Sequence, residues 1–414
     1  MRILLFTDCA PTEENYGGPS AFCFHLLNNL QKNNTVKIIT TNTNKVPKHI
    51  LAKSKKIFKG NYIVRPRTLF MKLLVSRKTG ALFSLFYNKD LPYISRYKLG
   101  HKTLKEIREF SPDAVLIYPS HLLLVCKQLS AYPIFSLGPD CLSLNSLRAL
   151  KDSYIYAPRT SFKYKKYLDT LKRQIYLERE LAKNIKANCL VGLEDSIIFN
   201  TITLSNKSVF LPHPHYKLSE KSIKLDKPEL KVLISGTYNI STYTDINKML
   251  RAFSSKKEVL KVFSFTFLGK GWNKIIPKLP NSMKVNTIEW VNDYVEEIKK
   301  HDIQIFPISH GGGTKGKVLD ALAMGLLCVG SYYAFENIAV NNGEHCIIYN
   351  DANQIVTILE DIVHNKEKYN SMAELGRESV RKYHNPKLCS NHLIDIIKGK
   401  KPNVAKTYLC RNFI

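Results

Sequence analysis

The most informative stretch of this sequence reads Ser309-His310-Gly311-Gly312-Gly313-Thr314-Lys315-Gly316-Lys317-Val318-Leu319-Asp320-Ala321-Leu322-Ala323-Met324-Gly325. It follows an apolar run over residues 303–308, which predicts a buried strand. Three glycines come next, and a helical pattern opens at about Thr314 or Lys315. Glycines at such a junction let backbone N–H groups approach an anion, and the helix dipole favours negative charge there. Because two lysines and one carboxylate lie in the first two turns, the stretch suits a ligand that carries both phosphate and sugar hydroxyls.

Strand-like and helix-like segments alternate on both sides of this stretch. In the first half, residues 2–7 and 36–40 read as strands, and the segment between them, which opens with Pro19, has apolar residues at helical spacing. Such βαβ units predict an α/β architecture of two Rossmann-like, doubly wound parallel sheets. Further strands are predicted at residues 113–118, 133–137, 188–192, 208–211, 230–235, 263–268, 284–290, 327–330 and 346–349.

The chain length of 414 residues allows two ordinary domains. Regular structure stops at Pro212-His213-Pro214-His215, and the following stretch 219–229 is polar and rich in lysine. We therefore expect an N-terminal domain over residues 1–215, a linker over 216–229 and a C-terminal domain over 230–385. The tail, residues 386–414, is expected to cross back to the N-terminal domain.

The composition narrows the class of protein further. The hydrophobic content of 44% and charged content of 23% are typical of globular proteins. The nine cysteines are scattered singly, without a C-x-x-C pair, so no metal or redox site is indicated. The start is too short an apolar run for a signal peptide, and no apolar run is long enough to span a membrane. These features favour a cytoplasmic location.

The positive charge is concentrated in one part of the chain. The net charge is +28, and residues 45–108 hold 17 Lys and Arg but only two Asp and Glu. Such a segment implies an anionic partner: nucleic acid, an anionic membrane surface or a phosphorylated substrate; a solvated basic face is the alternative. The segment interrupts the strand–helix alternation, and its basic, aromatic stretch 67–87 suits a membrane interface. An ordinary helix would instead bury the apolar residues Leu69, Phe70, Leu73 and Leu74 in the core.

The first half also contains candidate functional residues at predicted strand ends. Gly17-Gly18 precedes a predicted helix, so it is either a phosphate or sugar contact or simply a turn. His121 follows the strand at 113–118, and Asp140 follows the strand at 133–137. Open α/β sheets bind ligands at the carboxyl ends of their strands. His121 and Asp140 are therefore catalytic candidates, with a structural role as the alternative.

The motifs and their order resemble glycosyltransferase family four, whose members are retaining two-domain enzymes with the GT-B fold. One subgroup has the nucleotide-sugar motif Gly-x-Gly-Thr-x-x-Lys-x-Leu-Glu-Ala-x-Ala-x-Gly, which residues 311–325 match closely. Weaker matches are Gly17-Gly18, Leu211-Pro212-His213-Pro214, Phe267-Leu268-Gly269-Lys270-Gly271 and the helical tail around residues 373–380. The resemblance covers most of the chain outside residues 45–108 and 141–187, and it implies two domains that face a cleft.

The resemblance also implies roles for the residues of the motif. The glycine loop and two lysines would neutralise the diphosphate of a nucleotide sugar without a metal, since fixed donors stabilise a developing charge. Asp320 would accept hydrogen bonds from two ribose hydroxyls. Lys317 and Asp320 are three residues apart on one helix face, so an ordinary surface salt bridge is the alternative. The predicted donor-binding residues are Gly17, Gly18, Gly311, Gly312, Gly313, Thr314, Lys315, Lys317 and Asp320, and the catalytic candidates are Lys317, His121 and Asp140.

Three departures from the family pattern bear on the chemistry. Gly312 stands where the family has a sugar-binding carboxylate, eight positions before Asp320, and Asp320 itself replaces a glutamate. Gly236-Thr237-Tyr238 replaces the arginine and lysine that begin the family's second domain. We therefore expect Lys315 and Lys317 to take over the neutralisation of the diphosphate.

The predicted function is transfer of a sugar, with retention, from a nucleotide-diphosphate donor to a glycan or lipid-linked acceptor. The resemblance places such a reaction in cell-surface polysaccharide or lipopolysaccharide synthesis. The basic segment would hold the protein on the anionic inner face of the cell membrane. No metal cofactor and no nucleic-acid partner are expected. The alternatives are a nucleotide-sugar epimerase of the same fold, a non-catalytic member of the family, or a nucleic-acid-binding protein that uses residues 65–86.

Overall fold

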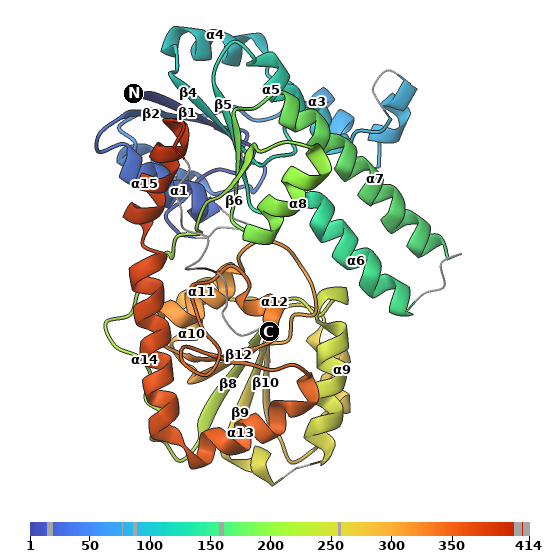
Figure 1. The fold of residues 1–414 in the computed structure, drawn as a ribbon, viewed down its shortest axis with the longest axis vertical. Coiled ribbons are helices and arrows are strands. Elements are labelled where there is room, and N and C mark those ends of the chain that lie inside the picture. The colour runs from blue at the N-terminus through green and yellow to red at the C-terminus, as the bar shows by residue number, and fades with distance from the viewer. Residues whose placement is uncertain are drawn as a thin grey trace. The chain divides into compact units, whose positions relative to one another are not determined.

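The computed structural model describes residues 1–14, 20–76, 78–85, 89–156, 161–255, 258–400 and 408, which form two compact units (Figure 1). The first unit takes its residues from Met1–Leu150, Ala157–Tyr216 and Pro386–Val404. The second unit takes its residues from Lys151–Tyr156, Lys217–Asn385 and Ala405–Ile414. Each unit is built around one parallel sheet.

The first unit contains a seven-stranded sheet in the order β3-β2-β1-β4-β5-β6-β7. Every pairing is parallel, and Thr7 lies level with Thr40 on one side and Tyr118 on the other. The strand order reverses between β1 and β4, which is where open α/β sheets bind ligands. The strands are β1 (Arg2–Thr7), β2 (Thr35–Thr40), β3 (Tyr62–Val64), β4 (Ala114–Tyr118), β5 (Ile134–Gly138), β6 (Ala187–Leu190) and β7 (Ser208–Phe210).

Helices cover both faces of this sheet because successive strand residues point to opposite sides. Ile3 and Leu5 pack in one core with α1 and α15, whereas Leu4 and Phe6 pack in a second core with α4, α5, α7 and α8. Helices α1 and α15 lie side by side although they come from opposite ends of the chain (Figure 1). The helices of these layers are α1 (Ser20–Leu30), α4 (His101–Phe110), α5 (Leu123–Gln128), α7 (Phe162–Lys183), α8 (Leu193–Thr203) and α15 (Pro386–Ile397), and α6 (Leu142–Tyr156) precedes α7.

The basic segment 45–108 belongs to the sheet layers, so the prediction that it interrupts the alternation is wrong. It contains α2 (Lys48–Ile57), the edge strand β3 and the start of α4, and β3 pairs in parallel with β2. The three residues of β3, Tyr62-Ile63-Val64, are too few to stand out as a strand in the sequence. The segment also contains the short helix α3 (Leu69–Val75) and a 3-10 helix at Gly80–Leu85.

The second unit contains a six-stranded parallel sheet in the order β10-β9-β8-β11-β12-β13. The order again reverses at the centre, between β8 and β11. The strands are β8 (Leu230–Ser235), β9 (Phe263–Leu268), β10 (Lys284–Ile288), β11 (Ile303–Phe306), β12 (Leu327–Gly330) and β13 (Ile347–Ile348).

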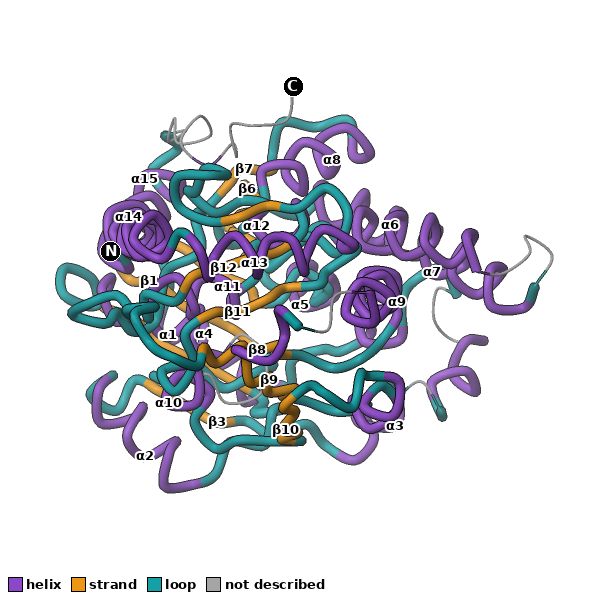
Figure 2. Tube along the Cα trace, turned by 90° about the horizontal axis from the view of Figure 1, so that it is seen from below, coloured by secondary structure: helices purple, strands orange, loops and turns teal. Residues whose placement is uncertain are grey.

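Helices also cover both faces of the second sheet. One core joins Val232 and Ile234 to α9 and α13, and the other joins Leu233 and Phe306 to α10, α11 and α12. Figure 2 shows the orange strands between purple helices. These two doubly wound sheets confirm the predicted α/β architecture. The helices are α9 (Ile240–Ser255), α10 (Tyr294–Ile298), α11 (Gly316–Ala323), α12 (Tyr332–Phe335), α13 (Ile355–His364) and α14 (Lys366–Tyr383).

Candidate active site

The glycine loop joins the carboxyl end of β11 to α11 in the second unit, beside the central reversal of strand order. Gly311 and Gly313 have φ angles of 144° and 61°, in the region that side chains other than glycine rarely adopt. The loop therefore needs glycine at these positions to make its turn. Helix α11 begins at Gly316, with Lys315 as its N-cap residue, which is slightly later than the sequence pattern predicts.

Lys315 is hydrogen-bonded to the glycine loop. Its Nζ donates hydrogen bonds to the carbonyl oxygens of Gly312 at 2.7 Å and Gly313 at 2.9 Å. A side chain at Gly311 would place its Cβ 3.3 Å from Lys315 Cε. The ammonium group thus holds two consecutive loop carbonyls in place.

Lys317 connects α11 to the end of β8. Its Nζ donates a hydrogen bond to the carbonyl oxygen of Ser235 at 2.9 Å, and it lies 2.8 Å from where a Cβ of Gly236 would stand. The ammonium therefore occupies the space that a side chain at Gly236 would need. Burial, together with the nearby charge of Lys315, lowers the pKa of Lys317 to about 8.

Asp320 is a buried carboxyl group one turn further along α11. Only 8% of the residue is exposed, and burial raises its pKa to about 7. Among the described residues no ion pair joins Asp320 to Lys317, although the two are one turn apart. The alternative that they form a surface salt bridge is therefore wrong, since Asp320 is buried and the two groups do not pair with each other.

A buried polar network underlies Ser235. The Ser235 hydroxyl lies 2.7 Å from the Tyr294 hydroxyl, and Gln304 Nε2 donates to both, at 2.7 Å and 2.9 Å. Burial raises the pKa of Tyr294, and the charge of Asp320 raises it further. This network fixes the end of β8, to which Lys317 is bonded. Sequence analysis missed these residues because they are far apart in the chain and carry no local motif.

The ends of β8 and β9 approach each other so closely that only glycine fits. A Cβ at Gly269, whose φ is 129°, would stand 2.3 Å from the carbonyl oxygen of Gly236. The same oxygen accepts a hydrogen bond from Trp272 Nε1 at 2.8 Å. Gly236 itself has a φ of 121°. The turns after both strands are thus fixed together beside Lys317.

In the first unit, a buried charged cluster lies at the end of β1. Oδ2 of Asp8 is 3.2 Å from Nε2 of His121 and 3.2 Å from the guanidinium of Arg67. Burial raises the pKa of Asp8, but the hydrogen bond and charge of His121 and the charge of Arg67 outweigh burial and hold that pKa below its usual value. Sequence analysis identified His121 but missed Asp8 and Arg67.

Asp140 has different surroundings. It follows β5, and its carboxylate accepts a hydrogen bond from Asn145 in α6. Among the described residues the carboxylate that contacts His121 belongs to Asp8. The structure therefore does not make Asp140 the partner of His121. Gly17 and Gly18, the other predicted donor-binding residues of the first half, lie outside the described residues.

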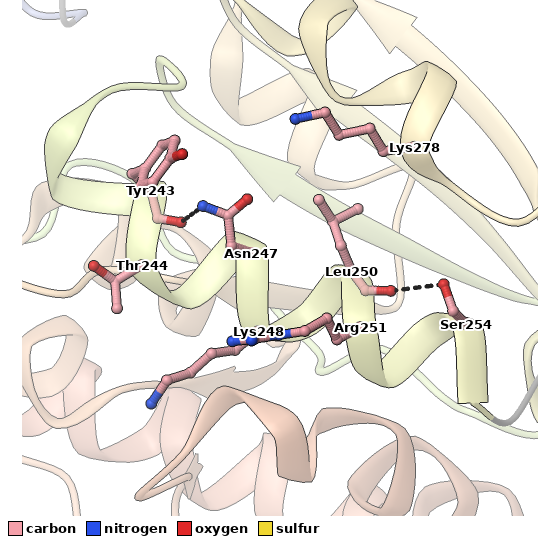
Figure 3. Close-up of a pocket in the computed structure, with 8 residues that line it drawn as sticks. All are labelled: Tyr243, Thr244, Asn247, Lys248, Leu250, Arg251, Ser254 and Lys278. Carbon is pink, nitrogen blue, oxygen red and sulfur yellow. Dashed lines mark hydrogen bonds between the residues drawn. The ribbon is translucent and has the colours of Figure 1, made fainter. Parts of the chain in front are cut away.

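A separate groove of about 660 Å³ runs along α9 in the second unit (Figure 3). Within it, Asn247 donates to the Tyr243 carbonyl and Ser254 to the Leu250 carbonyl, both inside the helix. Lys248 pairs with Asp351 at 2.6 Å. The groove includes no residue of the glycine loop. In the part of the chain that the structure describes, no group of three His, Cys, Asp or Glu side chains could hold a metal ion.

Comparison with known proteins agrees with this geometry. Residues 244–395 match a family model described as glycosyl transferase-like. No curated protein sequence matches the chain. Solved structures with the same fold share only about a tenth of their residues with it, so their likeness concerns the fold.

Three of these structures cover nearly the whole chain. Anabaena HepE in complex with UDP has 11% identity and a TM-score of 0.63, over 96% of this chain and 100% of that chain. Sucrose-phosphate synthase from Thermosynechococcus elongatus has 11% identity and a TM-score of 0.66, over 96% and 99%. An E. coli structure titled trehalose-6-phosphate, bound with UDP-2-fluoro glucose, has 10% identity and a TM-score of 0.60, over 97% and 100%.

The chain therefore has the two-sheet GT-B fold of these structures, and its second half contains a region similar to glycosyl transferases. Its glycosyl transferase-like region, residues 244–395, contains the glycine loop, Lys317 and Asp320.

Proposed function

We propose that this protein transfers a sugar, with retention, from a nucleotide-diphosphate donor to a glycan or lipid-linked acceptor. The observation that carries the proposal is the pair of buried groups on α11. Lys317 and Asp320 are desolvated next to a glycine loop and do not neutralise each other. Burying two unpaired ionisable groups is costly, and a ligand that bonds to both would offset the cost.

The chemistry of a nucleotide sugar fits this arrangement. When the glycosidic bond breaks, negative charge develops on the departing diphosphate, and fixed donors stabilise that charge better than mobile water does. The N–H groups of Gly311 to Thr314 and the ammonium of Lys317 would serve as these donors, while Lys315 holds the loop in shape. The Asp320 carboxylate would accept the ribose hydroxyls. The reaction is proposed to proceed without a metal, and the departing phosphate would help to deprotonate the acceptor.

Uridine diphosphate sugars are the first donors to test. HepE has been solved with UDP and with UDP-glucose, and the E. coli structure holds UDP-2-fluoro glucose. These ligands were bound to those proteins, and they are the reason to test uridine nucleotides first with this one.

The acceptor is proposed to lie at an anionic membrane surface, as in the synthesis of cell-surface polysaccharide or lipopolysaccharide. Of the four apolar residues considered in α3, only Leu74 is buried in the core. Leu69, Phe70 and Leu73 are exposed at 74%, 52% and 39%, and Leu82 nearby is exposed at 75%. We call these four exposed residues the α3 surface. An apolar surface on a strongly basic segment fits a lipid interface better than open solvent.

A thermal-shift screen tests the donor. The free protein would be heated with UDP, GDP, ADP, dTDP and CMP, and with their common sugar conjugates, each with and without EDTA. We expect one nucleotide diphosphate to raise the melting temperature. At a ligand concentration of a hundred times the dissociation constant, the free energy of unfolding should increase by about 2.7 kcal/mol. EDTA should leave the shift unchanged. The proposal fails if no nucleotide diphosphate raises the melting temperature.

Lys317→Ala tests the role of the ammonium. Release of UDP from UDP-glucose should fall by about 10²–10³-fold, as expected when one fixed donor to a developing charge is removed. Lys299→Ala is the matched control, because Lys299 is an exposed lysine of the same unit that pairs with Glu296. Near-normal turnover in Lys317→Ala would show that the diphosphate is neutralised by other groups.

A further inference from the structure

The buried cluster at the end of β1 carries an inference that rests on the proposed function and adds two residues to it. Asp8 is held by its backbone as well as by its side chain. Its N–H donates to the Tyr118 carbonyl at 3.3 Å, and its own carbonyl accepts from Thr41 Oγ at 3.0 Å and from Thr43 Oγ at 2.8 Å. The end of β4 and the segment that follows β2 therefore fix the backbone of Asp8, just after β1.

Arg67 is the second fixed member of the cluster. Its side chain is only 8% exposed, and its guanidinium stacks 5.0 Å above the ring of Tyr97. Tyr97 in turn stacks on Phe6 of β1 at 6.0 Å. Arg67 supplies a positive charge opposite Asp8 whether or not the imidazole of His121 is charged.

The contact between Asp8 and His121 defines which nitrogen of the imidazole carries the proton. The cluster keeps the pKa of Asp8 below its usual value, so the carboxylate is ionised at neutral pH and can only accept hydrogen bonds. The nitrogen that faces it, Nε2 at 3.2 Å, must therefore donate. In a neutral imidazole the other nitrogen, Nδ1, then carries a lone pair.

We propose that Asp8 and Arg67 are positioning residues that hold His121 in the Nε2-protonated tautomer, so that Nδ1 accepts a hydrogen bond from a sugar hydroxyl. His121 has 18% of its side chain exposed, compared with 5% for Asp8, so the imidazole is the member of the pair with access to a substrate. Asp8 touches no substrate itself. Its effect on the reaction passes through the orientation and the tautomer of His121.

The tautomer can be measured without any substrate. Long-range ¹H–¹⁵N NMR spectra of the full protein with labelled histidine distinguish a protonated from an unprotonated ring nitrogen, and His121→Gln identifies the signals of His121. We expect the Nε2-protonated tautomer in the wild-type protein at pH 8, and a mixture of tautomers in Asp8→Asn. A wild-type His121 protonated at Nδ1 overturns the proposal.

The kinetic consequence is measured as release of UDP from UDP-glucose. Asp8→Asn should lower kcat by about 10²-fold, the size of a general acid–base or orienting contribution, while KM changes much less. Asp8→Glu should restore part of kcat, because it keeps the carboxylate. An unchanged kcat in Asp8→Asn contradicts the proposal.

A matched control separates positioning from stability. Asp195 is a fully buried carboxylate of the same unit that accepts a hydrogen bond from the backbone N–H of Cys141. Asp195→Asn should lower the melting temperature but leave the His121 tautomer and kcat unchanged. If the wild-type protein releases no UDP from UDP-glucose, the proposed donor is wrong, whereas the tautomer measurement still decides the role of Asp8.

Discussion

Two ionisable residues on one short helix, the half-buried Lys317 and the buried Asp320, lie one turn apart without forming an ion pair. Most buried charged groups in proteins are paired, because an isolated charge loses its hydration. In this protein the desolvation appears as a lowered lysine pKa and a raised aspartate pKa. Such groups reduce the stability of the free protein, and under the proposed function a nucleotide sugar would bond to both.

Asp320→Asn should therefore stabilise the free protein at alkaline pH. The pKa of Asp320 is raised to about 7 in the folded state, so the folded protein binds this proton more tightly than the unfolded chain. The associated stability is present below about pH 4 and is lost as the pH rises to about 7. Above pH 7 the ionised carboxylate costs at most roughly 4 kcal/mol. The asparagine variant should melt several degrees higher than the wild type at pH 8 and at nearly the same temperature at pH 4.

Tryptophan fluorescence measures this effect in the relevant unit, because both tryptophans of the chain, Trp272 and Trp290, belong to the second unit. The stabilised variant should also lose the thermal shift given by UDP. Asp302→Asn is the control: Asp302 is buried, pairs with Lys227 and accepts a hydrogen bond from the N–H of Lys231 at 2.8 Å. The same substitution there should lower the melting temperature at both pH values. Equal pH dependence in the Asp320 variant and the wild type would contradict the argument.

At the scale of elements, the two turns that follow β8 and β9 form the backbone against which Lys317 lies. Gly269→Ala should destabilise the second unit by about 2–4 kcal/mol, because it adds both a strained φ and a Cβ that collides with the Gly236 carbonyl. Since Lys317 lies against Gly236, the variant should also weaken the thermal shift given by UDP.

Gly343→Ala separates the effect of the strained φ from the effect of the Cβ collision. Gly343 has a φ of 79°, but a Cβ there would meet nothing within 4 Å. That variant should lose only about 1 kcal/mol, the cost of the left-handed conformation alone, and keep the response to UDP. Similar melting temperatures for the two variants would mean that the close approach of the strand ends does not constrain the unit.

The elements also show why the sequence predicts the fold better than the site. Strands such as β1, β8, β9 and β12 are buried on both faces, so each reads as an apolar run with the predicted bounds. The strand β3 is short and at the sheet edge, and it was missed. The bonds from His121 to Asp8 and from Lys317 to Ser235 join residues 113 and 82 positions apart. The spacing of residues in the sequence does not reveal such contacts, because they form only when the sheets fold.

At the scale of the whole molecule, the basic charge bears on the proposed contact with a membrane. The part of the chain that the structure describes has no helix long and apolar enough to cross a membrane. The α3 surface has basic neighbours on its own segment, Lys72 and Lys78, both exposed. Attraction between this charge and anionic lipid would bring the apolar residues to the interface, where their burial adds to the binding energy.

The protein should therefore sediment with vesicles that contain anionic lipid at about 50 mM salt, and less at about 500 mM, since salt screens the attraction. Replacing Leu69 and Phe70 by serine should weaken binding by at least about tenfold, because each side chain contributes on the order of 1.5–3 kcal/mol when fully buried. Leu204→Ser is the matched control, because Leu204 is 90% exposed in the same unit but lies outside the basic segment. The α3 surface does not bind membranes if the Leu69 and Phe70 double variant binds as well as Leu204→Ser, or if binding depends on neither salt nor lipid charge. Its exposed leucines would then be expected to contact a protein partner.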